Sequence, residues 1–404
     1  MSQKLHTIAR RTLIAALLSG TALNANADVI TDWNTKTGEF IVESKLGTPP
    51  AIRVMALVQT ATYEAVQASR GGASVEAAVA AAHRATLTKL LPAQQAAIEA
   101  AYQAALTSIP EGPAKAAGIV IGERSAATTL AQRAGDTIAA ETYRPHTTAG
   151  VYVPTAAPAA PTWSLRKTWH LTGPAQFRVA PPPALGSATW ARDYNEVKAF
   201  GSKSSTQRSA EQTEIARFWE YSLPPIYFGV VRSVAAQPGR DVLRNARLFA
   251  AAAQALDDGM VGVFDSKYHY NFWRPATAIR NGDVDSNDET ARDASWSPLI
   301  PEPMHPEYPS AHATLAGAVG AVLKAEIGAG AVPILATASP TARGAMRRWA
   351  SIDDFVREVS ESRIYAGIHY RFSTDAGIAL GTSIGELTAR RVLQPGESVA
   401  RSAY

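Results

Sequence analysis

The sequence predicts an all-α fold, a large helical bundle, and three observations support this. Apolar residues recur at helical spacing along most of the chain, in alanine-rich stretches separated by prolines. The strict alternation typical of strands is sparse and nowhere sustained. The chain has 404 residues, 46% of them hydrophobic, which is enough for a sizeable core. Because alanine is the best helix former and lets helices approach closely, this composition suits a bundle.

The expected helices follow one another from residue 49 to residue 392. In the first, Val54, Leu57 and Val58 belong to an apolar face with helical spacing. Pro92 and Pro113 separate the helices that follow. The ranges predicted to be helical are 49–69, 75–91, 93–108, 113–134, 187–200, 208–222, 241–262, 310–328, 351–365 and 375–392.

Residues 1–27 have the organisation of a signal peptide. A start with three basic residues precedes an apolar run over 12–23, and Ala25 and Ala27 give the small-residue pattern of a cleavage site. We therefore expect an exported protein, periplasmic or secreted, cleaved near Ala27. Cleavage would reduce the net charge from +4 to 4 − 3 = +1, so no nucleic-acid partner is predicted. No later stretch is long and apolar enough for a membrane span in the mature chain.

The rest of the chain divides into an N-terminal helical region over 28–244, a motif-bearing region over 245–395 and a tail over 396–404. The N-terminal region contains a Pro-rich excursion at 142–186, which includes Trp163 and Trp169. A linker would be polar and would lack aromatic residues, so the excursion is expected to be ordered and packed on the helices.

Three polar clusters carry the candidate chemistry. In the first, Lys267 and Arg274 lie two helical turns apart, so both cations can project from one face of a helix that Pro275 ends or kinks. Flanked by Phe272 and Trp273, they suit a recessed oxyanion site. Taken alone, the cluster is explained more simply as an amphipathic helix whose cations reach to water.

The second cluster opens the helix expected over 310–328. Ser310 stands at the N-cap behind Pro309, where free N–H groups and the helix dipole make an anion site. His312, at the second helical position, would face whatever binds there. Taken alone, a plain serine cap and a solvent-facing histidine account for the same residues.

The third cluster contains Ser362, Arg363 and His369, and Gly367 is expected to bend the chain. Taken alone, it is a helix C-terminus completed by basic residues. The conjunction of the three clusters changes the interpretation. Three cations, a helix N-terminus and two imidazoles can hold a tetrahedral oxyanion and supply a nucleophile and an acid/base.

Other chemistries have less support. The absence of cysteine excludes disulfides, thiolate nucleophiles and iron–sulfur clusters. No hydrolase elbow, P-loop or dinucleotide fingerprint occurs. His305, Glu307 and His312 could ligate a metal, but their spacing fits no standard site.

The order and spacing of the three clusters resemble the motifs of a known superfamily. They read Lys267-x6-Arg274-Pro275, Pro309-Ser310-Ala311-His312 and Ser362-Arg363-x5-His369. These are similar to the motifs of the type 2 phosphatidic acid phosphatases and vanadium-dependent haloperoxidases. The motif region covers roughly 245–395, and segments at 49–65 and 211–220 also look like the bacterial haloperoxidase-like branch. The resemblance implies that family's helical bundle.

The resemblance also implies a role for each matching residue. The residues that would hold vanadate, phosphate or another oxyanion are Lys267, Arg274, Ser310, Ala311, Arg363 and His369. Within this set, His369 would bond to the vanadium or act as the phosphatase nucleophile, and Lys267 would polarise peroxide. His312 would be the acid/base.

Two departures from the family pattern concern the surroundings of these residues. Ala311 replaces a glycine, which is tolerated if its φ is negative, because its N–H can still reach the oxyanion. Ser373 stands where an Asp is expected four residues after His369, and Asp375 comes two residues later. The carboxylate that would orient His369 is therefore absent, shifted or supplied from elsewhere.

Two residues bear on the halide. His305, five residues before Ser310, stands where chloroperoxidases of the family have Phe and algal bromoperoxidases have His. Phe264, three residues before Lys267, stands where a Trp is often found, and it would leave an aromatic wall. The resemblance thus favours bromide or iodide over chloride.

Two reaction classes fit this set of residues. The first is a vanadate-dependent haloperoxidase that oxidises halide with hydrogen peroxide at a His-bound vanadate. The second is a secreted acid phosphatase that acts on phosphate esters through a phosphohistidine. The upstream likeness and His305 favour the first. A third reading, an oxyanion-binding protein without activity, makes little use of two imidazoles. Only small-molecule substrates are expected as partners, apart from a possible homodimer.

Overall fold

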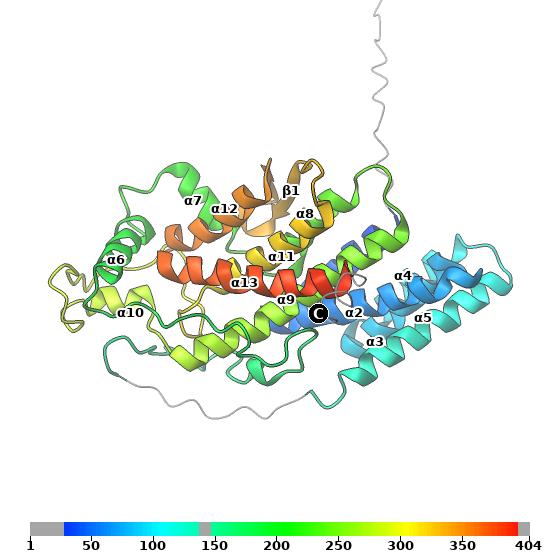
Figure 1. Ribbon diagram of the computed structural model, residues 1–404, viewed down its shortest axis with the longest axis horizontal. Coiled ribbons are helices and arrows are strands. Elements are labelled where there is room, and N and C mark those ends of the chain that lie inside the picture. Colours follow the sequence, from blue (N-terminus) through cyan, green and yellow to red (C-terminus); the bar gives the residue numbers. More distant parts are fainter. Residues whose placement is uncertain (1–27, 137–146, 395–404) are drawn as a thin grey trace, which may run out of the picture.

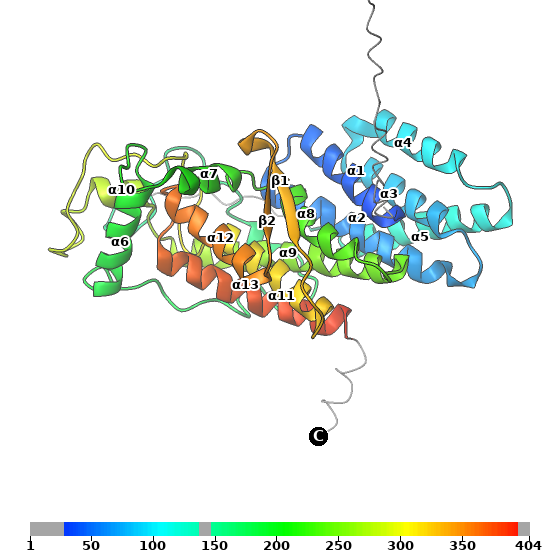
Figure 2. The same cartoon turned by 90° about the horizontal axis from the view of Figure 1, so that it is seen from above.

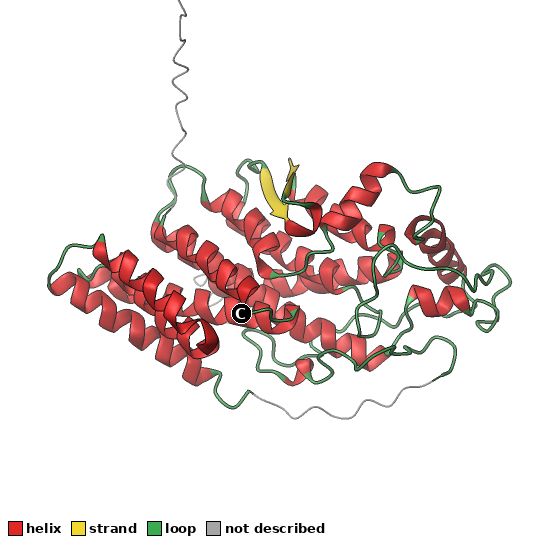
Figure 3. Cartoon of the chain, turned by 180° about the vertical axis from the view of Figure 1, so that it is seen from behind, coloured by secondary structure: helices red, strands yellow, loops and turns green. Residues whose placement is uncertain are grey.

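The computed structural model describes residues 28–136 and 147–394 and confirms the all-α prediction (Figure 1). The described residues form thirteen α-helices and one two-stranded antiparallel hairpin, which stands out among the helices in Figure 3. None of these helices is both long and apolar enough to cross a bilayer. The signal peptide expected over 1–27 and the tail expected over 396–404 lie outside the described residues.

The first five helices form one end of the molecule (Figure 1). They are α1 (Val29–Glu43), α2 (Thr48–Ala68), α3 (Val75–Leu90), α4 (Gln95–Thr107) and α5 (Pro113–Gln132). Four of them match expected helices, whereas α1 was not expected. Its sequence is rich in threonine, which is a weak helix former. The helix is stabilised instead by the Asp28 N-cap, whose carboxylate accepts from the Thr31 N–H, and by burial of Trp33 and Phe40.

The remaining elements form the other end of the molecule and the middle. They are α6 (Ala188–Gly201), α7 (Ala210–Phe218), α8 (Pro224–Ala235), α9 (Val242–Tyr270), α10 (Pro275–Arg280), α11 (Ala311–Ile327), β1 (Leu335–Ser339), β2 (Ala345–Trp349), α12 (Ile352–Tyr365) and α13 (Arg371–Val392). Helix α8 was not expected, and α9 extends to Tyr270 rather than ending at 262. The hairpin was not expected either, because two strands of five residues give little alternation; it pairs Leu335 with Trp349, and β1 packs on α8.

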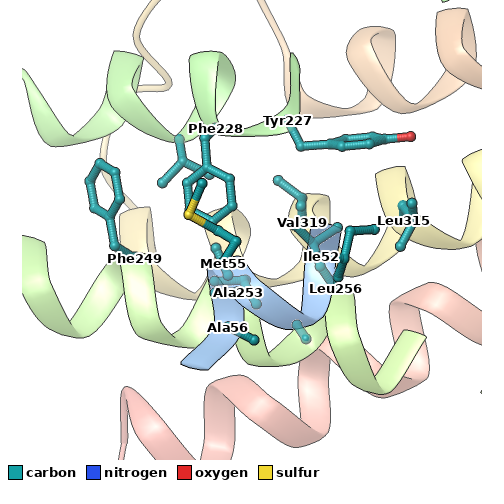
Figure 4. Close-up of a cluster of buried hydrophobic side chains, with 14 of the residues drawn as sticks. Ile52, Met55, Ala56, Tyr227, Phe228, Phe249, Ala253, Leu256, Leu315 and Val319 are labelled. Carbon is teal, nitrogen blue, oxygen red and sulfur yellow. The ribbon is translucent and has the colours of Figure 1, made fainter. Parts of the chain in front are cut away.

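The main core lies between α2, α8, α9 and α11. Figure 4 shows Met55 from α2, Phe228 from α8 and Leu256 from α9 among the apolar side chains that meet there. All three are at most 1% exposed. Helix α9 runs through the middle of the molecule and contacts α2, α11 and α13, so the position of its C-terminal end is set by packing on several sides (Figure 2).

Helices α11 and α13 pack unusually closely because glycines on α13 face α11. A Cβ on Gly377 would lie 2.6 Å from the carbonyl oxygen of Ser310, and one on Gly381 would overlap the carbonyl oxygen of Thr314. Real Cβ atoms do not approach oxygens so closely, so only glycine permits this helix separation. The contact at Ser310 fixes the start of α11 against the first turns of α13.

The described part of the Pro-rich excursion, 147–186, lies against α9. The carboxylate of Asp258 accepts backbone N–H groups from Trp169, His170 and Leu171 at 2.7, 2.8 and 3.3 Å. Further along, the N–H of Ala159 donates to the carbonyl of Met304 at 2.5 Å. The excursion is thereby anchored at α9 and holds the loop that precedes α11.

A buried histidine in α3 makes the stability of the fold dependent on pH. His83 is 0% exposed, its ring lies 5.0 Å from that of Trp33, and its Nδ1 donates to the Val79 carbonyl at 2.9 Å. Burial lowers the pKa of His83 to about 4. The unfolded chain takes up the proton near the ordinary value of 6.5, so the stabilisation from this group is present above pH 6.5 and is lost as the pH falls toward 4.

We expect the wild type to lose about 2 kcal/mol of unfolding free energy through His83 between roughly pH 7.5 and pH 5. His83→Phe keeps the ring beside Trp33 but cannot be protonated, so its stability should fall less over the same interval. Urea unfolding at both pH values measures the difference. Equal losses in the two proteins would contradict the assignment.

Candidate oxyanion site

The polar clusters lie at the ends of α9, α10, α11, α12 and α13. These helix ends lie toward the end of the molecule that holds α6 and α10 (Figures 1 and 2). The C-terminal end of α9 contributes Lys267, the N-terminus of α11 contributes Ser310 and the end of α12 contributes Arg363. Arg274 lies between α9 and α10, and His369 lies between α12 and α13. Residues far apart in the sequence are therefore brought to one site.

Lys267 and Arg274 converge, but not as residues of one helix. Helix α9 ends at Tyr270, and its C-cap, Asn271, has the left-handed φ of 47°; Arg274 is extended, with φ −80° and ψ 156°. The expectation that a single helix presents both cations is therefore wrong. The left-handed cap turns the chain instead, and both side chains donate to the Pro306 carbonyl, Lys267 Nζ at 2.9 Å and Arg274 Nη2 at 3.3 Å.

Ser310 is the N-cap residue of α11 and His312 occupies its second position, as the sequence predicts. The hydroxyl of Ser310 makes no capping hydrogen bond, and it is fully buried without a partner among the described residues. His312 Nε2 is likewise buried and without a partner. Ala311 is the first helical residue, so its backbone N–H belongs to the free N–H groups at the start of the helix.

Arg363 and His369 are separated by the sharp bend expected at Gly367, whose φ is +79° and whose missing Cβ leaves room for the Gly201 carbonyl. Arg363 Nη2 donates to the Trp219 carbonyl at 2.6 Å. The carbonyls of Trp219 and Tyr221 also lie beside the His312 imidazole. The segment between α7 and α8 thus positions both Arg363 and His312.

His369 is held on its Nδ1 side by Glu307. The Nδ1 atom lies 2.6 Å from Glu307 Oε1, and both residues are at most 2% exposed. Ser373 Oγ lies 3.4 Å from the same nitrogen, and Asp375 is exposed. The carboxylate missing from position 373 is therefore supplied from the loop that precedes α11.

The two halide-side residues also lie at this site. His305 Nδ1 lies 3.0 Å from Arg274 Nη2 and 3.2 Å from the Pro306 carbonyl oxygen, and the His305 ring lies 5.2 Å from the ring of Phe264. The guanidinium can only donate and the carbonyl can only accept, so these two neighbours favour opposite tautomers of the imidazole. Phe264 is 2% exposed and forms an aromatic wall behind the imidazole.

The site is strongly electropositive and buried. Lys267, Arg274 and Arg363 are 0%, 1% and 2% exposed. Burial, together with the neighbouring cations, lowers the pKa of Lys267 well below its ordinary value and that of Arg363 to about 10. Burial also raises the pKa of Glu307 to about 7, although Lys267 and Arg274 oppose the shift.

The imidazoles of the site are neutral for related reasons. Burial lowers the pKa of His369 well below its ordinary value, and Arg274, Lys267 and Arg363 add to the shift. The pKa of His312 is lowered by burial and then by Arg363 and Lys267. A neutral His369 that donates from Nδ1 keeps its Nε2 lone pair available on the side of Arg274.

Helix α6 supports the segment that contains His369. Asp193 Oδ2 accepts the N–H of Phe372 at 2.8 Å, and Glu196 forms a bidentate ion pair with Arg371. Trp190 packs against Tyr370, with ring centroids 5.0 Å apart. These contacts fix the residues that immediately follow His369.

The residues present fit a tetrahedral oxyanion such as vanadate or phosphate. Three buried cations lie beside two carboxylates, those of Glu302 and Glu307, and two buried polar groups, the Ser310 hydroxyl and His312 Nε2, have no partner among the described residues. Buried cations and unpaired polar groups are costly unless they are compensated, and an anion with several oxygens would satisfy both. A cation site has no such support, since no cluster of three His, Asp or Glu ligands occurs within 28–136 and 147–394.

All nine residues predicted from the sequence lie in or beside this site, and Glu307 and Trp219 were missed. Glu307 was considered only as a metal ligand. Glu307 is the single acidic residue between His305 and Lys324, and this isolation in the sequence could have identified it as the carboxylate partner of His369. The contribution of Trp219 is a main-chain carbonyl, which has no sequence signature.

Comparisons with known proteins agree with this description. Residues 247–397 match the family model for the VCPO second helical-bundle domain. Vanadium chloroperoxidase of Curvularia inaequalis is 30% identical over 172 residues; the match covers 35% of this chain but only 28% of that protein.

The fold is shared with solved structures of bacterial proteins. A bacterial vanadium-dependent iodoperoxidase superposes with a TM-score of 0.76 at 23% identity, over 90% of this chain and 95% of that one. A bacterial vanadium-dependent chloroperoxidase superposes with a TM-score of 0.70 at 16% identity, over 86% and 93%. These superpositions show that the chain shares the fold of the bacterial vanadium-dependent haloperoxidases, and the match over 247–397 supports the superfamily that its motifs resemble.

Proposed function

We propose that the chain is a vanadate-dependent haloperoxidase that oxidises bromide or iodide, with its catalytic region over 245–395. The observation that carries this proposal is the convergence of three buried cations and two unpartnered buried polar groups beside a neutral histidine. A site of this kind compensates a multiply charged oxyanion. When bound, vanadate supplies the centre at which peroxide is activated.

Each side chain then has a task that follows from its position. Arg274 and Arg363 bind the anion's oxygens, and the Ser310 hydroxyl and the N–H of Ala311 donate to others. His369 would hold the group through its Nε2 lone pair. Lys267 would serve as a cation that polarises peroxide, and His312 would serve as a base that accepts a proton from it.

The halide preference is proposed from His305 and Phe264. Arg274 Nη2 and the Pro306 carbonyl both contact Nδ1 of His305, and Phe264 places an apolar face beside this imidazole. A polar imidazole and an aromatic wall suit large, polarisable halides better than chloride, which is harder to oxidise.

His305→Phe is expected to lower the ratio of kcat/KM for bromide to that for chloride by about tenfold, or roughly 1.4 kcal/mol. The change removes the polar imidazole and its contact with Arg274 Nη2, and it leaves only apolar rings on the halide side. Halogenation of a chromogenic acceptor with each halide measures the ratio. His269→Phe makes the same substitution at an exposed position and should leave it unchanged. An unaltered ratio in His305→Phe would contradict the role of His305.

Two assays on one purified sample separate this activity from the alternative, a secreted acid phosphatase in which His369 attacks phosphorus. Halogenation that requires both vanadate and peroxide supports the proposal. Hydrolysis of p-nitrophenyl phosphate that vanadate inhibits, without any halogenation, would establish the phosphatase instead.

We also propose that the protein is exported after cleavage near Ala27, because of the signal pattern in residues 1–27. Mass spectrometry of the protein recovered from cell fractions would test this. A mature N-terminus at Asp28 is expected, and an intact Met1 on cytoplasmic material would refute export.

A further inference from the structure

We propose that Glu307 is the positioning residue of His369, which selects its tautomer and fixes its ring relative to Lys267. The inference rests on the proposed function, since it concerns the same site. According to this proposal, a carboxylate of the loop before α11 holds Nδ1 of His369. Helix α13 offers only the hydroxyl of Ser373 for this purpose.

The contacts of the carboxylate determine the tautomer. Glu307 Oε1 lies 2.6 Å from His369 Nδ1 and also accepts the backbone N–H of Tyr370 at 3.2 Å. One oxygen thus binds the imidazole and the main chain that follows it. On the other side of the ring, Arg274 Nη1 lies 3.4 Å from Nε2, and a guanidinium can only donate. Both neighbours therefore favour a proton on Nδ1 and a lone pair on Nε2.

The main chain of Glu307 links this histidine to the lysine. Its carbonyl accepts from Lys267 Nζ at 2.8 Å, and its N–H donates to the carbonyl of Phe272 at 2.9 Å. The same residue therefore holds the cation at the end of α9 through its backbone and the imidazole before α13 through its side chain. A change in its position would move the two groups together.

Position 373 of helix α13 is close enough to His369 for a carboxylate there to bind the imidazole. Ser373 is buried in the first turn of α13, and its Oγ lies 3.4 Å from Nδ1, too far for a strong hydrogen bond. An aspartate at this position extends one atom further and would reach the nitrogen. The geometry thus permits the carboxylate to be moved from the loop before α11 to helix α13, where it would still bind Nδ1 of His369.

The test compares Glu307→Ala with the double variant Glu307→Ala/Ser373→Asp. Removing the carboxylate should weaken binding of inorganic phosphate, measured by calorimetry, and lower halide oxidation, each by about 10- to 100-fold. The double variant should recover most of both losses. In histidine-selective ¹⁵N NMR spectra, the wild type and the double variant should show His369 protonated on Nδ1, and Glu307→Ala should show a mixture of tautomers.

The controls separate positioning from folding. Glu302→Gln removes another carboxylate close to Arg274, a half-buried one that accepts the Ala276 N–H and does not contact His369, so the His369 tautomer should be unchanged. If Glu307→Ala does not fold, Glu307→Gln serves in its place, because its amide fills the same space while its acceptor is weaker.

Two outcomes would overturn the proposal. One is a folded Glu307 variant that keeps the wild-type tautomer and phosphate affinity. The other is a folded double variant that recovers neither. If the wild type itself neither binds phosphate nor oxidises halide, the proposed function fails, whereas the tautomer spectra still decide whether Glu307 positions His369.

Discussion

His369→Asn is expected to lower halide oxidation by about 1,000-fold or more while the protein stays folded. Asparagine keeps an N–H where Nδ1 stands, so Glu307 retains its donor, but it has no basic nitrogen at the position of Nε2. The substitution therefore removes only the lone pair that faces the oxyanion. Steady-state oxidation of bromide at saturating vanadate and peroxide measures the loss.

His369→Ala should lose activity to the same extent, but at a cost in stability. It leaves the carboxylate of Glu307 buried without its imidazole partner, and an unpaired buried group of this kind destabilises a fold by about 1–3 kcal/mol. Thermal unfolding should thus rank the wild type first, then His369→Asn, then His369→Ala. Activity of either variant within tenfold of the wild type would show that His369 is not the residue that bonds to the central atom.

Gly381→Ala is expected to destabilise the protein by about 3 kcal/mol, although alanine is ordinarily the better helix former. The added Cβ would overlap the carbonyl oxygen of Thr314 and would lie 2.9 Å from the backbone nitrogen of Ala318. Both partners are backbone atoms of α11 that no rotamer change can move. The two helices must separate, and the melting temperature and phosphate affinity should fall together, because Ser310 is the N-cap residue of α11.

Gly259→Ala provides the matched control. Gly259 is a buried helical glycine of α9, but its Cβ would meet only side-chain carbons of Leu315 and Thr314, at 3.7 Å, which is ordinary contact. This variant should be stabilised by up to about 1 kcal/mol through helix propensity. Stabilisation by both substitutions would mean that the close packing of α11 and α13 does not limit stability.

The sequence predicted most helices because their apolar spacing is local information. The range 351–365 differs from α12 by one residue, and 113–134 exceeds α5 by two. Helix α1 and the β1–β2 hairpin escaped prediction because packing on other elements stabilises them, and α8 because its sequence opens with two prolines, Pro224 and Pro225. In the structure these prolines begin α8, in the first turn, where a missing N–H costs nothing.

At the site, the sequence predicted which side chains converge but not how they are held. Lys267 and Arg274 were identified by motif spacing, yet the turn at Asn271 depends on a left-handed cap that the spacing does not reveal. Glu307 was missed as the partner of His369 because the two residues are separated by 62 positions in the chain. A pairing of that kind is set by how α11 and α13 dock, which is tertiary information.

The carbonyl groups around the cations have a consequence for how the protein acquires its anion. Main-chain oxygens of Pro306, Ile368 and Trp219 accept from Lys267, Arg274 and Arg363. Folding itself therefore provides these charges with dipoles that replace part of the lost hydration, and a bound anion would supply the remaining compensation. A site of this kind would exchange one bound oxyanion for another without refolding. The concentrations of the competing oxyanions around the protein would then determine which one is bound. The same protein would therefore bind different anions in phosphate-rich and phosphate-poor surroundings.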